Sequence, residues 1–401
     1  MIDLRKTSAA AVLAACLLAS GCSAGGTPKP AGGTPTEPVP HGYVEGAQEA
    51  AEQQSRLIMT DADTGTVRVL DLITEDVTPL QPVGPVKGIT ADGRFAYLTT
   101  GTGSEIVDGG AWTVDHGDHV HYYRARIRPA GEIGGPGPVR VHSGPGLTAL
   151  SFGDGSVRLL DRKALEEARP GAGRSLPAAT APAIPYKERL VLPGAGAARD
   201  RVEIRDRKGG PVATLRESCS EPSGTALTRR GVVLGCADGA LLVSENGGTF
   251  SAEKIPYGKA VAPAERAAEF RHRAGSTTLT AEAGPDAAWV LDVTERTWKR
   301  IETGPVAAVN TAGEGTPLLV LGTDGSLSAY DLATGKRTAR TPLLPPISDG
   351  PAPVIEVDTG RAYVNDPAGR KVHEIDFNDR LRRARTFSLD FTPTYMVETG
   401  R

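Results

Sequence analysis

A short sequence pattern recurs along most of this chain and constrains its fold more than any other feature. The pattern is a β-branched or Leu-rich run that ends in Asp, and its clear copies end at Asp71, Asp161, Asp206, Asp292, Asp331 and Asp376. Successive copies lie 39 to 45 residues apart, or about twice that, and each double interval contains one weaker copy. Eight units of about 44 residues result, and units of this length with four short strands are typical of β-propeller blades.

The two ends of the repeating region predict how such a ring closes. Segments that begin with Gly-Pro-Val at Gly84, Gly137 and Gly304 have the pattern expected of innermost strands, and the C-terminal segment Thr392–Gly400 has the same shape. The first unit starts at Arg56 with no such strand before it. We therefore predict an all-β propeller of eight blades in which the C-terminal strand completes the first blade and leaves no open sheet edge. Seven blades, or two β-sandwiches, are the alternatives.

The N-terminal residues resemble a bacterial lipoprotein signal. Arg5 and Lys6 precede an apolar run, Ala9–Leu18, that is too short to span a bilayer as a helix, which takes about 20 residues. The run leads through Ala-Ser-Gly to Cys22, the residue that would be acylated, although Leu18 stands one place early. We predict a signal peptide over residues 1–21 and a lipid on Cys22 that anchors the protein to the outer face of the cell membrane. A cleaved secretory signal is the alternative, and it too places the protein outside the cytoplasm.

Residues 22–54 are expected to be a flexible tether, and residues 55–401 the propeller domain. Ser23–Pro40 consists almost entirely of Gly, Pro, Thr and Ala, a composition that cannot bury a core. The following segment Glu45–Gln54 is rich in Ala, Glu and Gln, and we expect one or two turns of helix there.

Composition and cysteine content narrow the class of protein. The formal net charge of −3 gives no basic footprint for nucleic acid. Cys219 and Cys236 flank two predicted neighbouring strands and can form a disulfide, as expected outside the cytoplasm, with a buried free pair as the alternative. The chain has no Gly-x-Ser-x-Gly elbow, phosphate loop or nucleotide fingerprint, and no paired acid site could be located. We therefore predict that it is not an enzyme.

The densest cluster of potential ligands lies in Trp112–Tyr123. Three of the seven His residues, His116, His119 and His121, fall there and alternate with Asp115 and Asp118. Imidazole nitrogens and carboxylate oxygens are ligands for Zn²⁺ and similar ions. If the chain is extended after His119, the side chains of His119 and His121 point to one face. Gly117 permits a tight turn, which can bring His116 and Asp118 towards the same face. The alternative is an exposed polar hairpin turn.

We expect this cluster in the second blade, inside a long insertion between its second and third strands. That position would open on the face of the ring that carries the blade-to-blade connections, near the central channel. His142 is expected on the next inner strand, either as a further ligand or as a polar residue that lines the channel.

Three segments, His41–Ala47, Trp112–Tyr123 and Gly235–Ala240, resemble actinobacterial secreted propeller lipoproteins that accompany metal ABC transporters. These are similar to the periplasmic zinc metallochaperones of the AztD type, and the resemblance covers most of residues 41–401. It implies an accessory protein that binds zinc and hands it to the solute-binding protein of the transporter. The run from Asp115 to His119 matches the Asp/His-rich motif of that family.

The chain also departs from this family, which has further His residues in neighbouring blades. Here the corresponding positions hold Arg140 and Ser223-Gly224. A complete zinc shell would therefore need His121, His41 or His142.

Two functions follow from these observations. The first is a monomeric accessory of zinc or manganese uptake in which His116, His119 and His121 bind the metal, Asp118 is a fourth ligand and Asp115 orients an imidazole through its second nitrogen. Binding needs neutral imidazoles, so affinity should fall as the pH drops through the histidine range near ~6.5. The second is a cell-surface scaffold for protein interactions that binds no metal. In both, contact with the membrane is through the lipid alone.

Overall fold

The computed structural model describes residues 43–116, 119–137, 139–176, 182–194, 196–347 and 350–401. These residues belong to one compact unit, Gly42–Arg401. The predicted signal peptide, Cys22 and His41 lie outside the described residues. Across the described part, no helix combines the length and apolar character needed to cross a bilayer.

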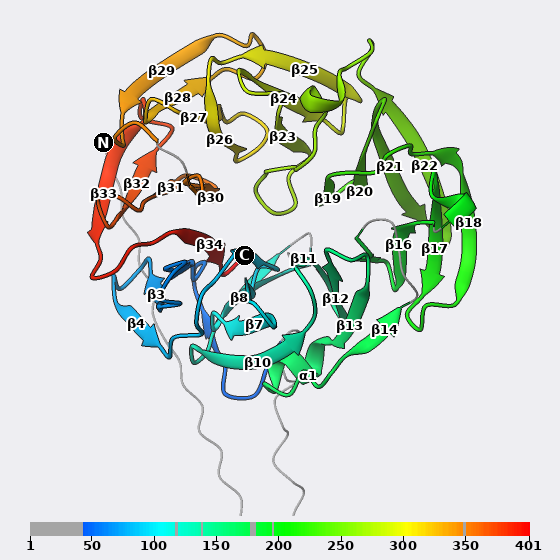
Figure 1. Cartoon of the computed structure of the whole chain (residues 1–401), viewed down its shortest axis with the longest axis horizontal. Helices are drawn as coiled ribbons and strands as arrows, with labels where there is room; N and C mark the ends of the chain where they lie inside the picture. The colour runs from blue at the N-terminus through cyan, green and yellow to red at the C-terminus, as the bar shows by residue number, and fades with distance from the viewer. Residues whose placement is uncertain (1–42, 117–118, 138, 177–181, 195, 348–349) are drawn as a thin grey trace, which may run out of the picture. The chain divides into compact units, whose positions relative to one another are not determined.

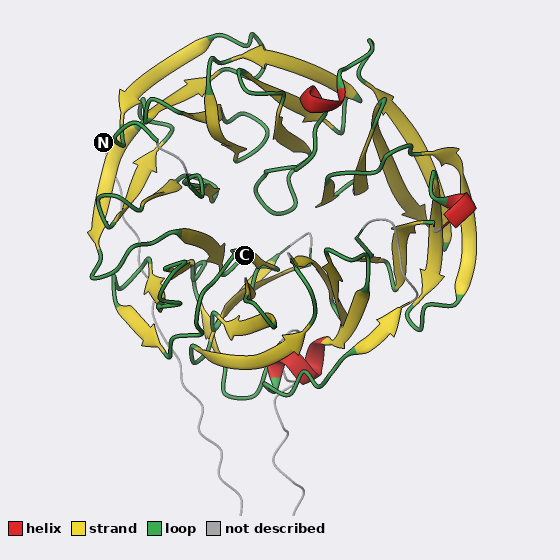
Figure 2. Ribbon diagram, viewed as in Figure 1, coloured by secondary structure: helices red, strands yellow, loops and turns green. Residues whose placement is uncertain are grey.

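The regular secondary structure of the unit is almost entirely β-strand, with loops between the strands, as Figure 2 shows. The first four sheets, each given from its inner to its outer strand, are β34 (Tyr395–Thr399), β2 (Arg56–Thr60), β3 (Val67–Asp71) and β4 (Val77–Leu80); β5 (Gly88–Ala91), β6 (Phe95–Thr99), β7 (Gly103–Asp108) and β10 (Arg128–Gly134); β11 (Val139–Gly144), β12 (Leu147–Phe152), β13 (Val157–Asp161) and β14 (Arg174–Leu176); and β15 (Ile184–Tyr186), β16 (Arg189–Pro193), β17 (Arg201–Asp206) and β18 (Pro211–Ser218).

Four further sheets continue the series around the ring in Figure 1. They are β19 (Thr225–Thr228), β20 (Gly231–Cys236), β21 (Gly239–Asn246) and β22 (Thr249–Pro256); β23 (Thr278–Glu282), β24 (Ala287–Asp292) and β25 (Thr297–Glu302); β26 (Val306–Thr311), β27 (Leu318–Gly322), β28 (Ser326–Tyr330) and β29 (Arg337–Pro342); and β30 (Ile355–Val357), β31 (Ala362–Asp366), β32 (Lys371–Asp376) and β33 (Arg382–Ser388). The short helices are α1 (Arg162–Glu166), η1 (Gly196–Ala198) and η2 (Pro263–Glu265).

The ring closes as the sequence predicted. The C-terminal strand β34 pairs with β2 along its whole length, from Arg56 opposite Thr399 to Thr60 opposite Tyr395. The first sheet is thus made from both ends of the repeating region, and the prediction of an all-β propeller closed by the C-terminal strand is confirmed.

The core lies between neighbouring sheets. Leu57 and Met59 of β2, for example, pack against Tyr363 and Val372 of the last sheet. Middle strands such as β2 are buried on both faces, whereas the outer strand β22 alternates exposed and half-buried residues because one of its faces meets solvent. Burial of this apolar area, at about 25 cal/mol per Å², is the main stabilising term.

The disulfide predicted from the sequence is present. Cys219 and Cys236 are bonded to each other, and both are buried. The bond links the residue that follows β18 to the end of β20, and so ties the outer strand of one sheet to the next sheet.

A ninth sheet stands apart from the series, and it corrects two predictions. Its order is β1 (Gln48–Ala50), β9 (Val120–Arg124) and β8 (Ala111–Asp115). The segment Glu45–Gln54 was expected to be helical, but β1 is a strand because its backbone pairs with β9. It therefore lies within residues 22–54, the predicted tether.

The second correction concerns the place of the insertion. The hairpin β8–β9 leaves the ring between β7 and β10, the third and fourth strands of the second sheet, not between the second and third. Successive strands are antiparallel, so this insertion lies on the face where inner strands end, opposite the blade-to-blade connections.

Candidate metal site

Three imidazoles gather at the end of the β8–β9 hairpin. In its register Val114 faces His121 and Asp115 faces Val120, and the backbone N–H of His116 donates to the carbonyl of His119 at 3.0 Å. The two strands are thus paired as far as His116 and His119, and alternation along β9 directs His121 to the same face as Tyr123.

The three rings are in mutual contact. The ring centroids of His116 and His119 are 4.7 Å apart and the rings are stacked, while His121 meets them edge-on at 5.3 and 5.0 Å. One ligand nitrogen from each ring lies within 4.8 Å of the other two. A tetrahedral zinc ion with bonds of ~2.1 Å separates its nitrogen ligands by roughly 3.4 Å. The observed limit of 4.8 Å is wider than this, and His116 and His119 are exposed.

The base of the hairpin is a stack of flat side chains. The Arg94 guanidinium lies 3.8 Å from the centroid of the Trp112 ring, Trp112 stacks on Tyr123 at 5.4 Å, and Tyr123 stacks on His121 at 6.2 Å. Arg94 is itself buried and forms two hydrogen bonds with Asp108, at 3.0 and 2.9 Å. His121 is therefore attached to the core of the second sheet, while the other two imidazoles project into solvent.

The hairpin sits close to the C-terminal strand, which explains the pair of glycines at its root. A Cβ at Gly109 would lie 2.5 Å from Thr399 Oγ1, and one at Gly110, which has a φ of +64°, would lie 2.5 Å from the Ala125 carbonyl oxygen. The Thr113 hydroxyl donates to the carbonyl of Gly400 at 2.8 Å. These contacts fix the hairpin on the face where β34 ends.

The structure adds one residue that the sequence did not indicate. In the pairing of β1 with β9, Glu49 faces Tyr123, and Glu49 Oε1 lies 2.6 Å from His121 Nδ1. Gln48 supports this pairing, because its Oε1 accepts from Arg124 Nε at 3.2 Å. Burial, and then the Glu49 carboxylate, raise the pKa of Tyr123. No motif marks Glu49, which comes from a segment that we expected to be helical tether.

The other predicted ligands are not brought into this group. Asp115 ends β8 and is exposed, and its orienting role stays a prediction. Asp118 and His41 lie outside the described residues. His142 is in β11, where its Nε2 is 2.9 Å from Thr225 Oγ1, and burial, followed by the charge of Arg140, lowers its pKa to about 4. Among the described residues, the group with ligand atoms in reach of one ion consists of the three His residues of the hairpin.

The positions that depart from the resembled family contact each other. Arg140 Nη1 donates to the carbonyl of Ser223 at 3.3 Å. A guanidinium has no lone pair for a metal, so Arg140 contributes a hydrogen bond here and cannot be a metal ligand.

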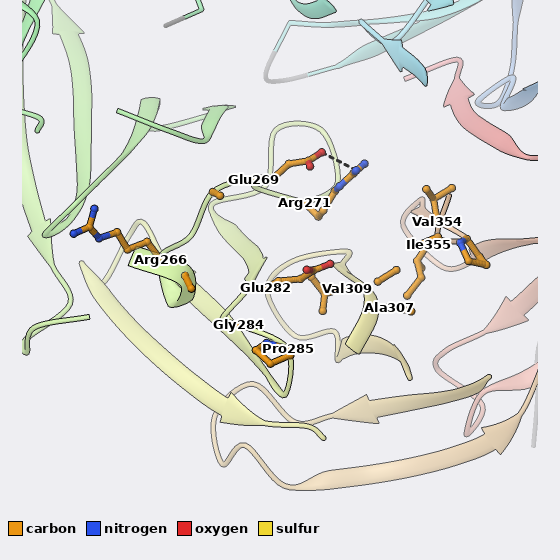
Figure 3. A pocket seen from close by; sticks show the side chains of 15 residues that line it. Arg266, Glu269, Arg271, Glu282, Gly284, Pro285, Ala307, Val309, Val354 and Ile355 are labelled. Carbon is orange, nitrogen blue, oxygen red and sulfur yellow. Dashed lines mark ion pairs between the residues drawn. The ribbon is translucent and has the colours of Figure 1, made fainter. Parts of the chain in front are cut away.

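Two cavities lie elsewhere. One, of about 760 Å³, is in the centre of the ring and is lined by inner-strand residues that include His142, His272 and Arg401. The other, of about 510 Å³, is shown in Figure 3, where the Glu269–Arg271 ion pair of 2.6 Å lies near Glu282. Neither includes the three imidazoles of the hairpin.

The fold and this group together define a closed β-propeller that carries exposed imidazoles on an insertion of its second sheet. Its fold is that of AztD. The crystal structure of AztD from Citrobacter koseri matches at a TM-score of 0.72 and 22% identity over 87% of this chain and 98% of that one. The structure of apo AztD from the same organism matches at 0.72 and 20% identity, over 86% and 98%. The AztD-type propeller expected from the sequence resemblance is thus confirmed as a fold.

A more distant match comes from a protein with a different description. Dihydro-heme d1 dehydrogenase NirN in complex with DHE gives a TM-score of 0.54 at 14% identity, over 86% of this chain and 75% of that one. No family model and no curated protein matches the sequence.

Proposed function

We propose that this protein is an extracytoplasmic lipoprotein that binds a divalent metal ion, with Zn²⁺ as the favoured ion, and passes it to the solute-binding protein of a metal ABC transporter. The observation that carries the proposal is the convergence of His116, His119 and His121, each with a nitrogen within 4.8 Å of the others. Three imidazoles on one hairpin are a donor set for a transition metal, and no packing requirement of the ring explains them.

The donor set selects among metals. Neutral imidazole suits zinc, copper and nickel, whereas manganese and magnesium prefer carboxylate and water oxygens. Three protein nitrogens leave one position of a zinc tetrahedron for Asp118, water or a donor from another protein. Because two of the three imidazoles are exposed, an acceptor protein can reach the ion before the hairpin releases it. In the transfer, the bonds from the ion to the hairpin imidazoles would break as bonds to the ligands of the acceptor form, and no other bond of either protein would change.

The remaining features fit an accessory protein at the cell surface. The fold is shared with AztD, and the resemblance noted in the sequence implies zinc handling beside a transporter. The disulfide between Cys219 and Cys236 fits an oxidising compartment. A lipid on Cys22 would keep the protein close to the transporter that it serves, and we propose that it acts there as a monomer.

Metal titration of the mature full-length protein tests the proposal. The wild type should bind one Zn²⁺ in competition with a chromogenic chelator, and the His116→Ala/His119→Ala variant should lose at least 100-fold in affinity, because a single imidazole retains few of the ligand bonds. A matched control changes Glu245 and Asn246 to Ala beside the β21–β22 turn, and should bind as the wild type does. Unchanged affinity in the double His variant would remove this site.

A second measurement separates metal transfer from the scaffold function. Zinc-loaded protein is mixed with the solute-binding protein of a zinc ABC transporter from the same organism, and the metal content of each is measured after separation. Transfer that outpaces release to a chelator supports the proposal. Capture of surface proteins that is indifferent to chelator, with no transfer, would favour the non-metal scaffold.

A further inference from the structure

Strand β1 is the one contributor to the hairpin sheet that precedes the ring in sequence. Its three residues Gln48, Glu49 and Ala50 pair with Arg124, Tyr123 and Tyr122 of β9. β1 is an edge strand, and its first two residues are exposed. A three-residue edge strand contributes little to the stability of a fold by itself. We therefore expect the role of β1 to lie in its side chains.

The side chain of Glu49 reaches the least exposed of the three imidazoles. Glu49 Oε1 lies 2.6 Å from His121 Nδ1. A carboxylate can only accept, so this contact places the ring proton on Nδ1 and leaves Nε2 with a free lone pair. Metal-binding imidazoles are commonly held in this way, by a carboxylate on the nitrogen that does not bind the metal.

We propose that Glu49 is a positioning residue for His121, and that docking of strand β1 on β9 and metal binding on the hairpin stabilise each other. This inference rests on the proposed function. Glu49 fixes both the tautomer and the direction of His121, while the stack on Tyr123 fixes the position of its ring. The metal in turn makes the Nδ1–H of His121 a better donor, and so strengthens its hydrogen bond to the strand.

The coupling has a direct consequence for release. By linkage, any factor by which docked β1 raises metal affinity is the same factor by which bound metal favours docking. An acceptor protein that draws β1 away from β9 would therefore lower the affinity of the site as it takes the ion. The segment that joins the ring to the N-terminal part of the chain would then act on metal release without contacting the metal.

Variants of the mature full-length protein at Glu49 test the positioning role. Loss of a carboxylate partner of this kind typically lowers metal affinity 10–100-fold, so Glu49→Ala should fall in that range. Glu49→Gln keeps an accepting oxygen but loses the charge, and should fall between Glu49→Ala and the wild type. Glu52→Gln is the matched control, because Glu52 is an exposed carboxylate just beyond β1. It should bind Zn²⁺ as the wild type does.

Two readouts distinguish positioning from a general structural effect. In the metal-free protein, nitrogen NMR of the His121 ring should report the proton on Nδ1 in the wild type and in Glu49→Gln, and a shift towards Nε2 in Glu49→Ala. Backbone hydrogen exchange in β1 and in β9 should slow when Zn²⁺ is added to the wild type, and this protection should shrink in Glu49→Ala.

The outcomes are separable. Wild-type affinity and an unchanged His121 ring signature in Glu49→Ala would overturn the inference while leaving the metal site intact. Reduced affinity without slower exchange in β1 would overturn the coupling between strand and metal. If His116→Ala/His119→Ala also bound Zn²⁺ normally, the proposed function itself would fail, and this inference with it.

Discussion

The protein places its described imidazoles in two contrasting environments. On the hairpin, His116, His119 and His121 touch one another and two of them are exposed. Within the ring, His142 and His272 are held neutral by burial, and each has a hydrogen-bond partner on a neighbouring inner segment. The same side chain is thus a potential metal ligand where it is clustered and accessible, and a hydrogen-bonded residue on the wall of the central cavity where it is separate.

This comparison shows why the count of His residues does not identify the site. An imidazole binds metal only if its lone pair is free and two or three other donors lie within reach. His142 and His272 lie apart within the ring, whereas the hairpin, which follows the third strand of the second sheet, brings three imidazoles together.

The stability of the ring should depend strongly on the cation of Arg401 at its centre. Arg401 Nη2 lies 2.8 Å from Glu398 Oε2 and also pairs with Glu356, and the side chain of Glu398 is fully buried. Arg401→Ala would leave these carboxylates without their cation, and breaking a buried ion pair costs about 3–5 kcal/mol of unfolding free energy. Denaturant unfolding of the metal-free protein measures the loss.

A surface ion pair is the control. Asp390 is 70% exposed and lies 3.4 Å from Arg68, so Asp390→Ala should cost less than about 1 kcal/mol. If the ring and the hairpin are independent, zinc affinity of folded Arg401→Ala should stay within about threefold of the wild type. Equal destabilisation by the two substitutions would contradict the role given to the buried pair.

Acid should weaken the ring even without metal. Burial lowers the pKa of His142 and that of His272 to about 4, whereas an unfolded histidine titrates near ~6.5. Between these values the unfolded chain binds protons that the folded ring does not. The free energy of unfolding should therefore fall as the pH drops from about 6.5 to about 4, by on the order of 2 kcal/mol per histidine.

One carboxyl acts in the opposite direction. Burial raises the pKa of Glu398 to about 7 from an ordinary value of 4.5, so its contribution is present below 4.5 and is lost as the pH rises towards 7. His373, whose pKa is also lowered by burial, acts in the same direction as His142 and His272. Unfolding of the metal-free wild type and of His142→Gln across this range should give a shallower dependence in the variant, and identical slopes would show that His142 is not held neutral.

The sequence predicted the ring well because its signals are local and repeated. The inner strand at Gly137 was visible in the Gly-Pro-Val pattern, and the missing strand before Arg56 predicted that the C-terminal strand completes the first blade, as its pairing with β2 confirms. Cys219 and Cys236 were placed by the strands that they flank. The group of imidazoles was visible because three of seven His residues fall within one hairpin.

The parts that were missed depend on pairing between distant segments. Glu45–Gln54 has the composition of a helix, but β1 pairs with β9, which is about 70 residues away in sequence, and tertiary pairing overrides propensity. Strand β7 (Gly103–Asp108) has only two large apolar residues, Ile106 and Val107, although nearly all of it is buried. A strand with so weak a pattern is hard to recognise in the sequence, and the insertion lies one strand later than predicted.

The stack of side chains at the base of the hairpin should affect zinc affinity more than it affects the stability of the propeller ring. Trp112→Leu removes the indole that lies between Arg94 and Tyr123. The hairpin is then less ordered, and ordering its imidazoles on metal binding lowers the affinity. We expect a roughly tenfold loss of zinc affinity, about 1.4 kcal/mol, and a smaller change in unfolding of the ring. Chelator competition and denaturant unfolding measured on the same sample would show it. A variant that unfolds readily but binds zinc as before would reverse the comparison.

The smallest effect is expected at Asp115. This carboxylate lies next to His116 at the end of β8 and is exposed, so solvent screens its charge. If it orients an imidazole as the sequence predicts, Asp115→Asn should lower zinc affinity about threefold, less than Glu49→Gln, because Glu49 acts on the less exposed His121 through a contact of 2.6 Å. Competition titrations of both variants at low and high salt decide the order. An Asp115→Asn effect that exceeds that of Glu49→Gln would move the main orienting carboxylate from strand β1 to the hairpin itself.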